Sequence, residues 1–228
     1  MSPANDPTRQ RILEAAGQVF AEKGFEETSV REICGRANAN IAAVNYHFGD
    51  KFALYVDAVK QAHCQQGPPP DFPWTVETTP AQKLSDFIHQ MMTMMLDRDR
   101  PTWHLELMLR EMARPTKVCE DLVREFIGPM FTALLGIINE FVPPEVPLFR
   151  RQLLGFSIVG QCLLYKFHRP IGRLLIGEGP YEAVFDVTST AAHVTAFSVA
   201  GIEAVAREFQ TAQPKQTRVE SPAKEAAS

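Results

Sequence analysis

The chain has 228 residues, a formal net charge of −4, 45% hydrophobic residues and 22% charged residues. Such a chain forms one large domain or a small and a medium domain, and its composition excludes wholesale disorder. The net charge excludes a generally basic nucleic-acid-binding chain, so any DNA contact must come from a local patch. The polar start MSPANDPTRQR and the lack of an apolar run of about 18 residues lead us to expect neither export nor a membrane span, and therefore a cytoplasmic location.

The first 65 residues carry the start and stop signals of short helices. Asp6 precedes Pro7, a pair typical of an N-cap followed by the first helical position, and Gly24 ends the apolar stripe that follows. Ser29 and Glu32 have the spacing of a capping box, which predicts the start of a second helix. Asn38 suits a left-handed turn, and Asn40 suits the cap of a third, very short helix.

The third helix, in the stretch NANIAAVNYHFGDK, has an unusual surface. Only Val44 and Phe48 have the i, i+4 spacing that anchors a helix to a core, so Asn45, Tyr46 and His47 are predicted to face away from it. From Ile41 to Gly49 the chain carries no Lys, Arg, Asp or Glu, although a solvated helix face normally carries charges. Two short helices joined by a tight turn form a helix-turn-helix, which can present its second helix to a DNA major groove.

Longer helical patterns follow a breaker at Gly67 to Pro73, and no alternating pattern predicts a strand, so we expect an all-α protein. The expected organisation is a helix-turn-helix domain over 1–65, with the motif at about 28–47, a helical domain over 66–210 and a disordered tail over 211–228. The predicted helices of the second domain are approximately Pro80–Asp97, Pro101–Ala113, Lys117–Phe141, Val146–His168 and Tyr181–Phe209.

The run TRQRILEAAGQVFAEKGFEETSVREI (Thr8 to Ile33), followed by ANANIAAVNYHFGDK, resembles the N-terminal domain of TetR/AcrR-type transcriptional regulators over about the first 60 residues. The resemblance implies a three-helix helix-turn-helix domain and a larger helical ligand-binding and dimerisation domain. It implies a homodimer that binds a palindromic, double-stranded operator, usually as a repressor, and is released by a small-molecule effector.

The same resemblance assigns residues to DNA contact. Groove-facing or phosphate-facing roles go to Ile41, Ala42, Ala43, Asn45, Tyr46 and His47, with Asn40 as the cap and Lys51 and Thr28 as phosphate contacts. Family members more often have tyrosine where this chain has Asn45. Residues 1–60 hold seven Lys and Arg against eight Asp and Glu. We therefore expect Arg9, Arg11, Arg31, Arg36 and Lys51 to gather toward DNA, with Glu14, Glu22, Glu26 and Glu27 on the opposite face.

The second domain suggests an interface and a pocket. Small residues in the last helix and an apolar helix at Val146–His168 predict a four-helix dimer interface, with a monomeric core as the alternative. Proline should kink the chain at Gly128–Pro129. The residues expected to contact a largely apolar effector are Met91, Met95, Trp103, His104, Met108, Phe131, Cys162, Tyr165 and His168.

Three other functions remain open at this point. A helical enzyme lacks any recognisable catalytic motif, so we expect no catalysis and no cofactor. A metal or redox sensor could use His63, Cys64, His104 and Cys119, although their spacing matches no known site and we expect no metal. A helical interaction module without an inducer would leave the uncharged cluster Asn45–His47 unexplained.

Overall fold

The computed structural model describes residues 6–64, 72–96, 101–167 and 169–211, and every element in these ranges is helical. This confirms the all-α prediction. The predicted tail, most of the Gly67–Pro73 breaker and His168 lie outside the described residues. The helices are α1 (Pro7–Glu27), α2 (Val30–Ala37), α3 (Ile41–Phe48), α4 (Lys51–Cys64), α5 (Pro80–Leu96), α6 (Thr102–Ala113), α7 (Lys117–Leu122), the π-helical turn η2 (Val123–Ile127), α8 (Gly128–Phe141), α9 (Leu148–Phe167), α10 (Arg169–Ile176), α11 (Glu178–Val184) and α12 (Val187–Thr211).

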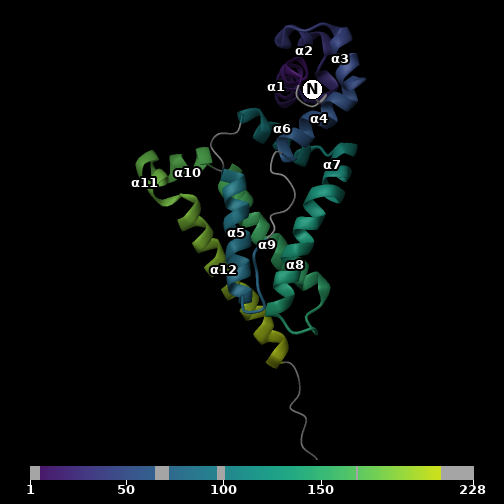
Figure 1. The fold of residues 1–228 in the computed structure, drawn as a ribbon. Coiled ribbons are helices and arrows are strands. Elements are labelled where there is room, and N and C mark those ends of the chain that lie inside the picture. Colours follow the sequence, from purple (N-terminus) through teal and green to yellow (C-terminus); the bar gives the residue numbers. More distant parts are fainter. Residues whose placement is uncertain (1–5, 65–71, 97–100, 168, 212–228) are drawn as a thin grey trace, which may run out of the picture.

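The helices pack around two hydrophobic cores. Figure 1 shows α1–α4 at one end of the molecule and α5, α8, α9 and α12 at the other. The first core joins α1–α4 and also includes Trp103 and Leu107 of α6 and Val118 and Leu122 of α7. The second lies among α5, α8, α9 and α12. Two helices C-terminal to the helix-turn-helix thus pack on its core. A domain boundary at residue 65 was expected from the sequence. In the structure, however, α6 and α7, which follow that boundary, pack on the core formed by α1–α4.

The residue pattern accounts for the first core. Ile12, Ala16, Val19 and Phe20 of α1 are fully buried, as their spacing predicted. The side chain of Asp6 caps α1 by accepting a hydrogen bond from the backbone N–H of Thr8 at 2.7 Å. Gly24 interrupts the helix with φ 83°, a left-handed value that favours glycine, and one more turn continues to Glu27.

The predicted interruption at Gly128–Pro129 occurs as a π-helical turn. The backbone N–H of Gly128 donates to the carbonyl of Val123, five residues earlier, and Pro129 follows in the first turn of α8. A proline ring collides with the carbonyl four residues before it in a regular α-helix. Widening the preceding turn relieves that collision.

The π-helical turn predicts opposite effects for two glycines of α8. A Cβ at residue 128 would lie 2.7 Å from the carbonyl oxygen of Val123, whereas a Cβ at residue 136 would meet nothing within 4 Å. We expect Gly128→Ala to lower the free energy of unfolding by about 1–3 kcal/mol, because backbone must shift to relieve the contact. Gly136→Ala should raise it by about 0.5–1 kcal/mol. Urea unfolding of both variants measures the difference, and equal effects would contradict the tight turn.

Helices α9 and α12 each leave one face open to solvent. On α9 the exposed side is an apolar stripe at i+4 and i+3 spacing that comprises Phe149, Leu153, Phe156, Gly160 and Leu164. On α12 the exposed small residues are Ala192, Ala196, Ala200, Gly201 and Ala204, beside Phe197. Ala191 and Ser198, two further small residues of α12, are buried inside the chain.

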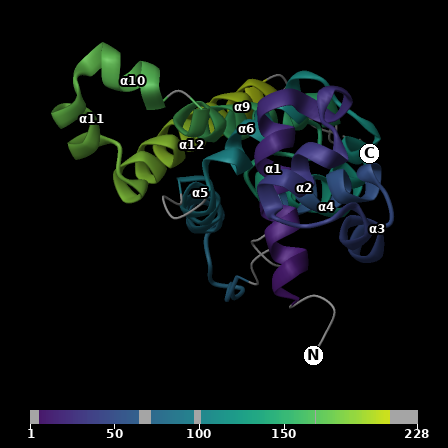
Figure 2. The ribbon, with the colours of Figure 1, turned by 90° about the horizontal axis from the view of Figure 1, so that it is seen from above.

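The segment between α9 and α12 differs from the expectation. The prediction of a single final helix over Tyr181–Phe209 was wrong. Tyr181 belongs to α11, and Asp186 caps the separate helix α12 by accepting a hydrogen bond from the backbone N–H of Ser189 at 3.0 Å. Helices α10 and α11 stand to one side of the bundle in both views (Figures 1 and 2). Leu174 and Leu175 of α10 are almost fully exposed there. Among the described residues, no helix combines the length and hydropathy that crossing a membrane requires.

Candidate nucleic-acid interface

Helix α3 begins and ends as its sequence predicted. Asn38 closes α2 in the left-handed conformation, with φ 46° and ψ 53°. The side-chain oxygen of Asn40 accepts a hydrogen bond from the backbone N–H of Ala43 at 2.7 Å, which caps α3. Val44 is fully buried and Phe48 nearly so. Two anchors and two asparagines therefore hold an eight-residue helix in a fixed orientation.

The opposite face of α3 is open and carries no charged side chain. Ile41, Ala42 and Asn45 are exposed, and Tyr46 is 84% exposed. Ala43 is half-buried against the first core. A large aromatic ring held in water on a thin, alanine-rich helix can approach base edges and thymine methyl groups closely.

The prediction that His47 is exposed was wrong. Its side chain is only 10% exposed, and its Nε2 lies 3.8 Å from the carboxylate of Asp6 at the start of α1. Its ring also meets those of Tyr46 and Phe48. The i, i+4 spacing identifies only the side of α3 that packs on the local core. It does not show that Asp6, at the start of α1, covers His47 from another side. His47 therefore positions α3 against α1.

Thr28 also needs correction. It is 3% exposed, and its hydroxyl donates to the carbonyl of Gly24 at 2.6 Å, so it closes the turn between α1 and α2. Ser29 is the N-cap of α2 and accepts from the N–H of Glu32 at 3.2 Å. In a full capping box the Glu32 carboxylate would also accept from the backbone N–H of Ser29. Here that carboxylate instead lies 2.7 Å from the ammonium of Lys23.

Cationic side chains near α3 are mostly held by other groups. Arg36 forms two hydrogen bonds with Glu22 at 2.6 and 2.5 Å, and Arg9 pairs with Asp57. The expected separation of basic and acidic faces is therefore wrong for Arg36 and Glu22. Lys51 begins α4, and its ammonium lies 4.4 Å above the ring of Phe25 and 3.4 Å from the carbonyl of Glu26.

Polar side chains of α6 form hydrogen bonds with α1 and α4 of the helix-turn-helix domain. The indole N–H of Trp103 donates to Glu14 at 2.6 Å, and the Arg110 guanidinium donates to the carbonyl of Glu22 at 2.8 Å. The buried carboxylate of Glu111 accepts from the hydroxyl of Tyr55 at 2.6 Å and from the N–H of Thr116 at 2.7 Å. Burial and the Glu111 carboxylate raise the pKa of Tyr55, so its hydroxyl stays protonated as a donor.

Removing that hydroxyl should loosen the junction. We expect Tyr55→Phe to lower the free energy of unfolding by about 1–3 kcal/mol, since it deprives a buried carboxylate of a donor. Tyr46→Phe is the matched control and should change stability by less than about 0.5 kcal/mol, because that ring is exposed. Urea unfolding separates the two, and equal stability of both variants would show that the Tyr55–Glu111 contact contributes nothing.

Comparison with known proteins identifies the family. Residues 12–58 match the model of bacterial regulatory proteins of the tetR family. Residues 80–202, more than half of the 228 residues, match the C-terminal domain of the HTH-type transcriptional dual regulator CecR. The chain belongs to the TetR family of transcriptional regulators. Members of this family are DNA-binding, helix-turn-helix regulators of transcription rather than enzymes.

Individual relatives agree with this assignment. The chain is 41% identical over 54 residues to the probable HTH-type regulator YttP of Bacillus subtilis and 39% identical over 54 residues to UidR of Escherichia coli K12. Each match covers 24% of this chain and only 26% and 28% of those relatives, so the likeness concerns about a quarter of each protein. A solved hemolysin II transcriptional regulator, HlyIIR, is 25% identical with a TM-score of 0.55, over 82% of this chain and 97% of that one.

The TetR-family chain does not bring the predicted effector residues together. Trp103, His104 and Met108 belong to α6, where Trp103 and Met108 pack on the first core and His104 is buried. Phe131 stacks on Phe156 at 4.8 Å, beside the α9 stripe. Cys162 is fully buried, Tyr165 lies 5.6 Å from Phe185 by ring centroids, and Met95 packs against the second core. Of the predicted set, Met91 alone among the described residues lines the pocket found in this regulator.

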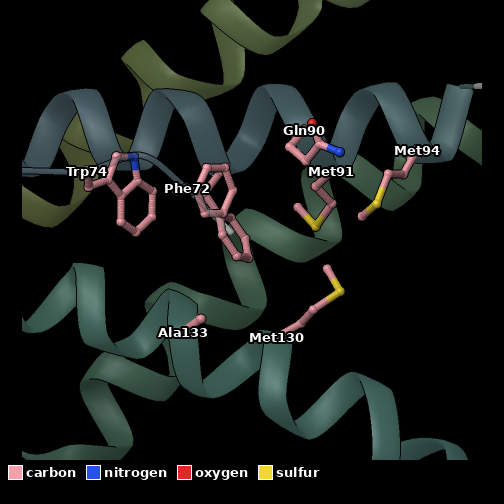
Figure 3. A pocket seen from close by; sticks show the side chains of 8 residues that line it. Phe72, Trp74, Gln90, Met91, Met94, Met130 and Ala133 are labelled. Carbon is pink, nitrogen blue, oxygen red and sulfur yellow. The ribbon is translucent and has the colours of Figure 1, made fainter. Parts of the chain in front are cut away.

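That pocket lies between α5, α8 and the segment before α5 (Figure 3). Phe72 and Trp74 come from the segment, and Phe87, Gln90 and Met94 come from α5 with Met91. Met130 and Ala133 of α8 form the other side. The sequence contained one overlooked signal, an aromatic pair in a proline-rich connection, where a solvated loop would be polar.

The cysteines give no support to a redox or metal sensor. Burial raises the pKa of Cys162 to about 12 and also raises the pKa values of Cys34 and Cys119. A raised pKa keeps the thiol protonated at neutral pH, and the thiolate is the reactive and metal-binding form. No group of three potential metal ligands occurs among the described residues, although the side chains of His63 and Cys64 lie outside that description.

Proposed function

We propose that this regulator binds a palindromic operator as a homodimer, acts as a repressor in the cytoplasm, and is released by a small, largely apolar effector. The observation that carries the proposal is α3: a helix anchored by Val44 and Phe48 whose outward face is exposed and uncharged. Such a face matches the neutral edges of bases, while charged side chains would be expected on a helix that meets only water.

In this proposal the DNA contacts come mainly from Ile41, Ala42, Asn45 and Tyr46, with Ala43 at the margin and Lys51 toward phosphate. Asn40 and His47 support α3 instead of reading bases, because Asn40 caps the helix and His47 is largely buried. Residues 1–65 form the DNA-binding domain and 66–210 the effector-binding and dimerisation domain, with α6 as the contact between them.

The proposed dimer uses the α9 stripe and the small-residue face of α12. Phe149, Leu153 and Phe156 would lose water together in a two-fold interface, and Ala196 and Ala200 would let helices approach closely. Two copies of α3 would then read two half-sites, whose centres lie about 34–36 Å apart or a multiple of that distance.

Selection of bound DNA from a random pool tests this function. The expected result is enrichment of an inverted repeat with that half-site spacing by the full-length chain. Enrichment of no sequence, or of a single half-site bound by a monomer in sedimentation, would contradict the proposal. The effector arm is tested separately, since an inducer should weaken operator binding by about 1–3 kcal/mol of coupling.

A further inference from the structure

The pocket beneath Phe72 and Trp74 has a lining of one chemical kind. Its side chains are aromatic, thioether or aliphatic except for Gln90, and none of them is charged. A charged ligand would lose its hydration there without gaining a counter-charge. Gln90 is the one polar side chain of this lining, and its amide can donate through the NH2 group or accept through the carbonyl oxygen. The lining therefore favours a neutral ligand with a single polar group.

The shape of the wall favours a flat ring. Phe72 and Trp74 are stacked, with centroids 4.3 Å apart and planes 4° from parallel. Across the pocket, Met91, Met94 and Met130 direct their side chains toward the same space (Figure 3). Thioether sulfur contacts aromatic rings favourably and adapts to irregular shapes. Together these walls provide polarisable surface for an aromatic molecule.

The size of the pocket shows that it must widen. Its volume is about 60 Å³, whereas an engineered cavity that binds benzene measures about 150 Å³. A one-ring ligand therefore has to displace part of a wall. Helices α5 and α8 resist displacement, because both are anchored in the second core by fully buried side chains. These are Leu84, Ile88 and Met92 of α5 and Leu134 and Ile138 of α8.

The third wall is easier to move. The segment Phe72–Trp74 is not helical, and both aromatic side chains are only partly buried against the second core. Phe72 makes a tilted ring contact with Phe87, and the indole N–H of Trp74 donates to the Asp86 carboxylate at 3.0 Å. The Lys83 ammonium lies 6.0 Å from the centroid of the Trp74 ring, which is about the longest distance at which a cation–π interaction is significant. Moving two side chains costs less than displacing a packed helix.

From this geometry we infer that the pocket takes a neutral, planar aromatic molecule with one hydrogen-bonding group, and that Phe72 and Trp74 swing outward to admit it. The inference rests on the proposed function in naming the effector site. The same two residues lie on the chain between α4 of the DNA-binding domain and α5. Their displacement therefore acts on the connection between the two domains.

Calorimetric titration of the full-length chain tests the ligand class with three matched probes. Para-ethylphenol should bind saturably with one site per chain, and para-ethylbenzoate, its anionic counterpart, at least about tenfold more weakly. Gln90→Leu should weaken para-ethylphenol binding roughly fivefold, the equivalent of one hydrogen bond. The same variant should leave binding of para-ethyltoluene, which has no hydroxyl, unchanged.

Two variants of α8 locate the site. Ala133→Phe should fill the pocket and weaken para-ethylphenol binding at least about tenfold, while Thr132→Phe, at the neighbouring exposed position that does not line the pocket, should have no effect. Equal binding by both variants, equal affinity for the benzoate, or no saturable binding of the phenol would each overturn the inference.

The moving wall has its own readout. The chain has two tryptophans, so Trp103→Phe leaves Trp74 as the single tryptophan, whose emission is selected by excitation at wavelengths that tyrosine does not absorb. Its emission should shift to longer wavelength as para-ethylphenol binds, because the indole leaves its stacked position for water. An unchanged spectrum at saturation would overturn the movement of this wall. A further result would be para-ethylphenol binding that Ala133→Phe prevents but that leaves operator affinity unchanged. That result would contradict the effector part of the proposed function, while the assignment of the pocket as a ligand site would remain supported.

Discussion

Replacing Tyr46 by alanine should reduce operator affinity by roughly 30-fold or more, with stability unchanged within about 0.5 kcal/mol. The ring is 84% exposed and packs only along its own helix, near His47. A side chain that contacts base edges contributes about 1–3 kcal/mol to recognition, and a dimer loses that contribution in both half-sites. Fluorescence anisotropy with the selected operator measures the affinity, and urea unfolding measures the stability.

His47→Ala provides the contrast for this variant. Because the His47 side chain is 10% exposed beside Asp6, its loss should lower the free energy of unfolding as well as operator affinity. Tyr46→Phe, which keeps the ring, should retain most of the binding energy. Operator binding by Tyr46→Ala at the affinity of the unaltered chain would exclude α3 as the reading helix.

A glutamate in place of Leu153 should convert the dimer into a monomer and reduce operator affinity more than about 100-fold. Leu153 is 54% exposed between Phe149 and Phe156 of the α9 stripe, where a partner in the proposed dimer would enclose it. A charge buried without a partner costs several kcal/mol, and symmetry introduces it twice. Sedimentation velocity and operator binding of the same preparation report the two consequences together.

Val76→Glu is the matched control for Leu153→Glu. Val76 is fully exposed in the turn before α5 and belongs to neither α9 nor α12. We expect this control to remain dimeric and to bind the operator normally. If Leu153→Glu also stays dimeric, the interface lies on another face, and the exposed leucines of α10 become the next surface to alter.

Local signals in the sequence predicted the helix-turn-helix well. Asn38 and Asn40 act through backbone groups three or four residues away, and Val44 and Phe48 were recognised by their i, i+4 spacing, so both features are written in residue spacing. His47 was misplaced because its environment includes Asp6, much earlier in the chain. Thr28 was misplaced because the non-helical turn at Gly24 brings the carbonyl of Gly24 to its hydroxyl, and that turn was not predicted in this form. Whether a polar residue faces water is a tertiary property.

The effector residues illustrate the same limit more strongly. Methionines and aromatic residues occur in both cores, and composition does not distinguish a residue in a packed core from one that lines a cavity. Trp103 looked suited to a ligand pocket, yet its ring lies against Gly17 of α1, where a Cβ would come within 2.4 Å of it. Only the path of the chain decides that Phe72, from a connection, faces Met130.

The exposed leucines of α10 and the open stripe of α9 have a consequence for how stability is measured. A folded state that exists as a pair of chains gains free energy with total protein concentration, by about 1.4 kcal/mol for each tenfold increase. For the proposed dimer, thermal unfolding should therefore begin at lower temperature in dilute samples than in concentrated ones. The abundance of the chain would then set which fraction of it persists as a dimer.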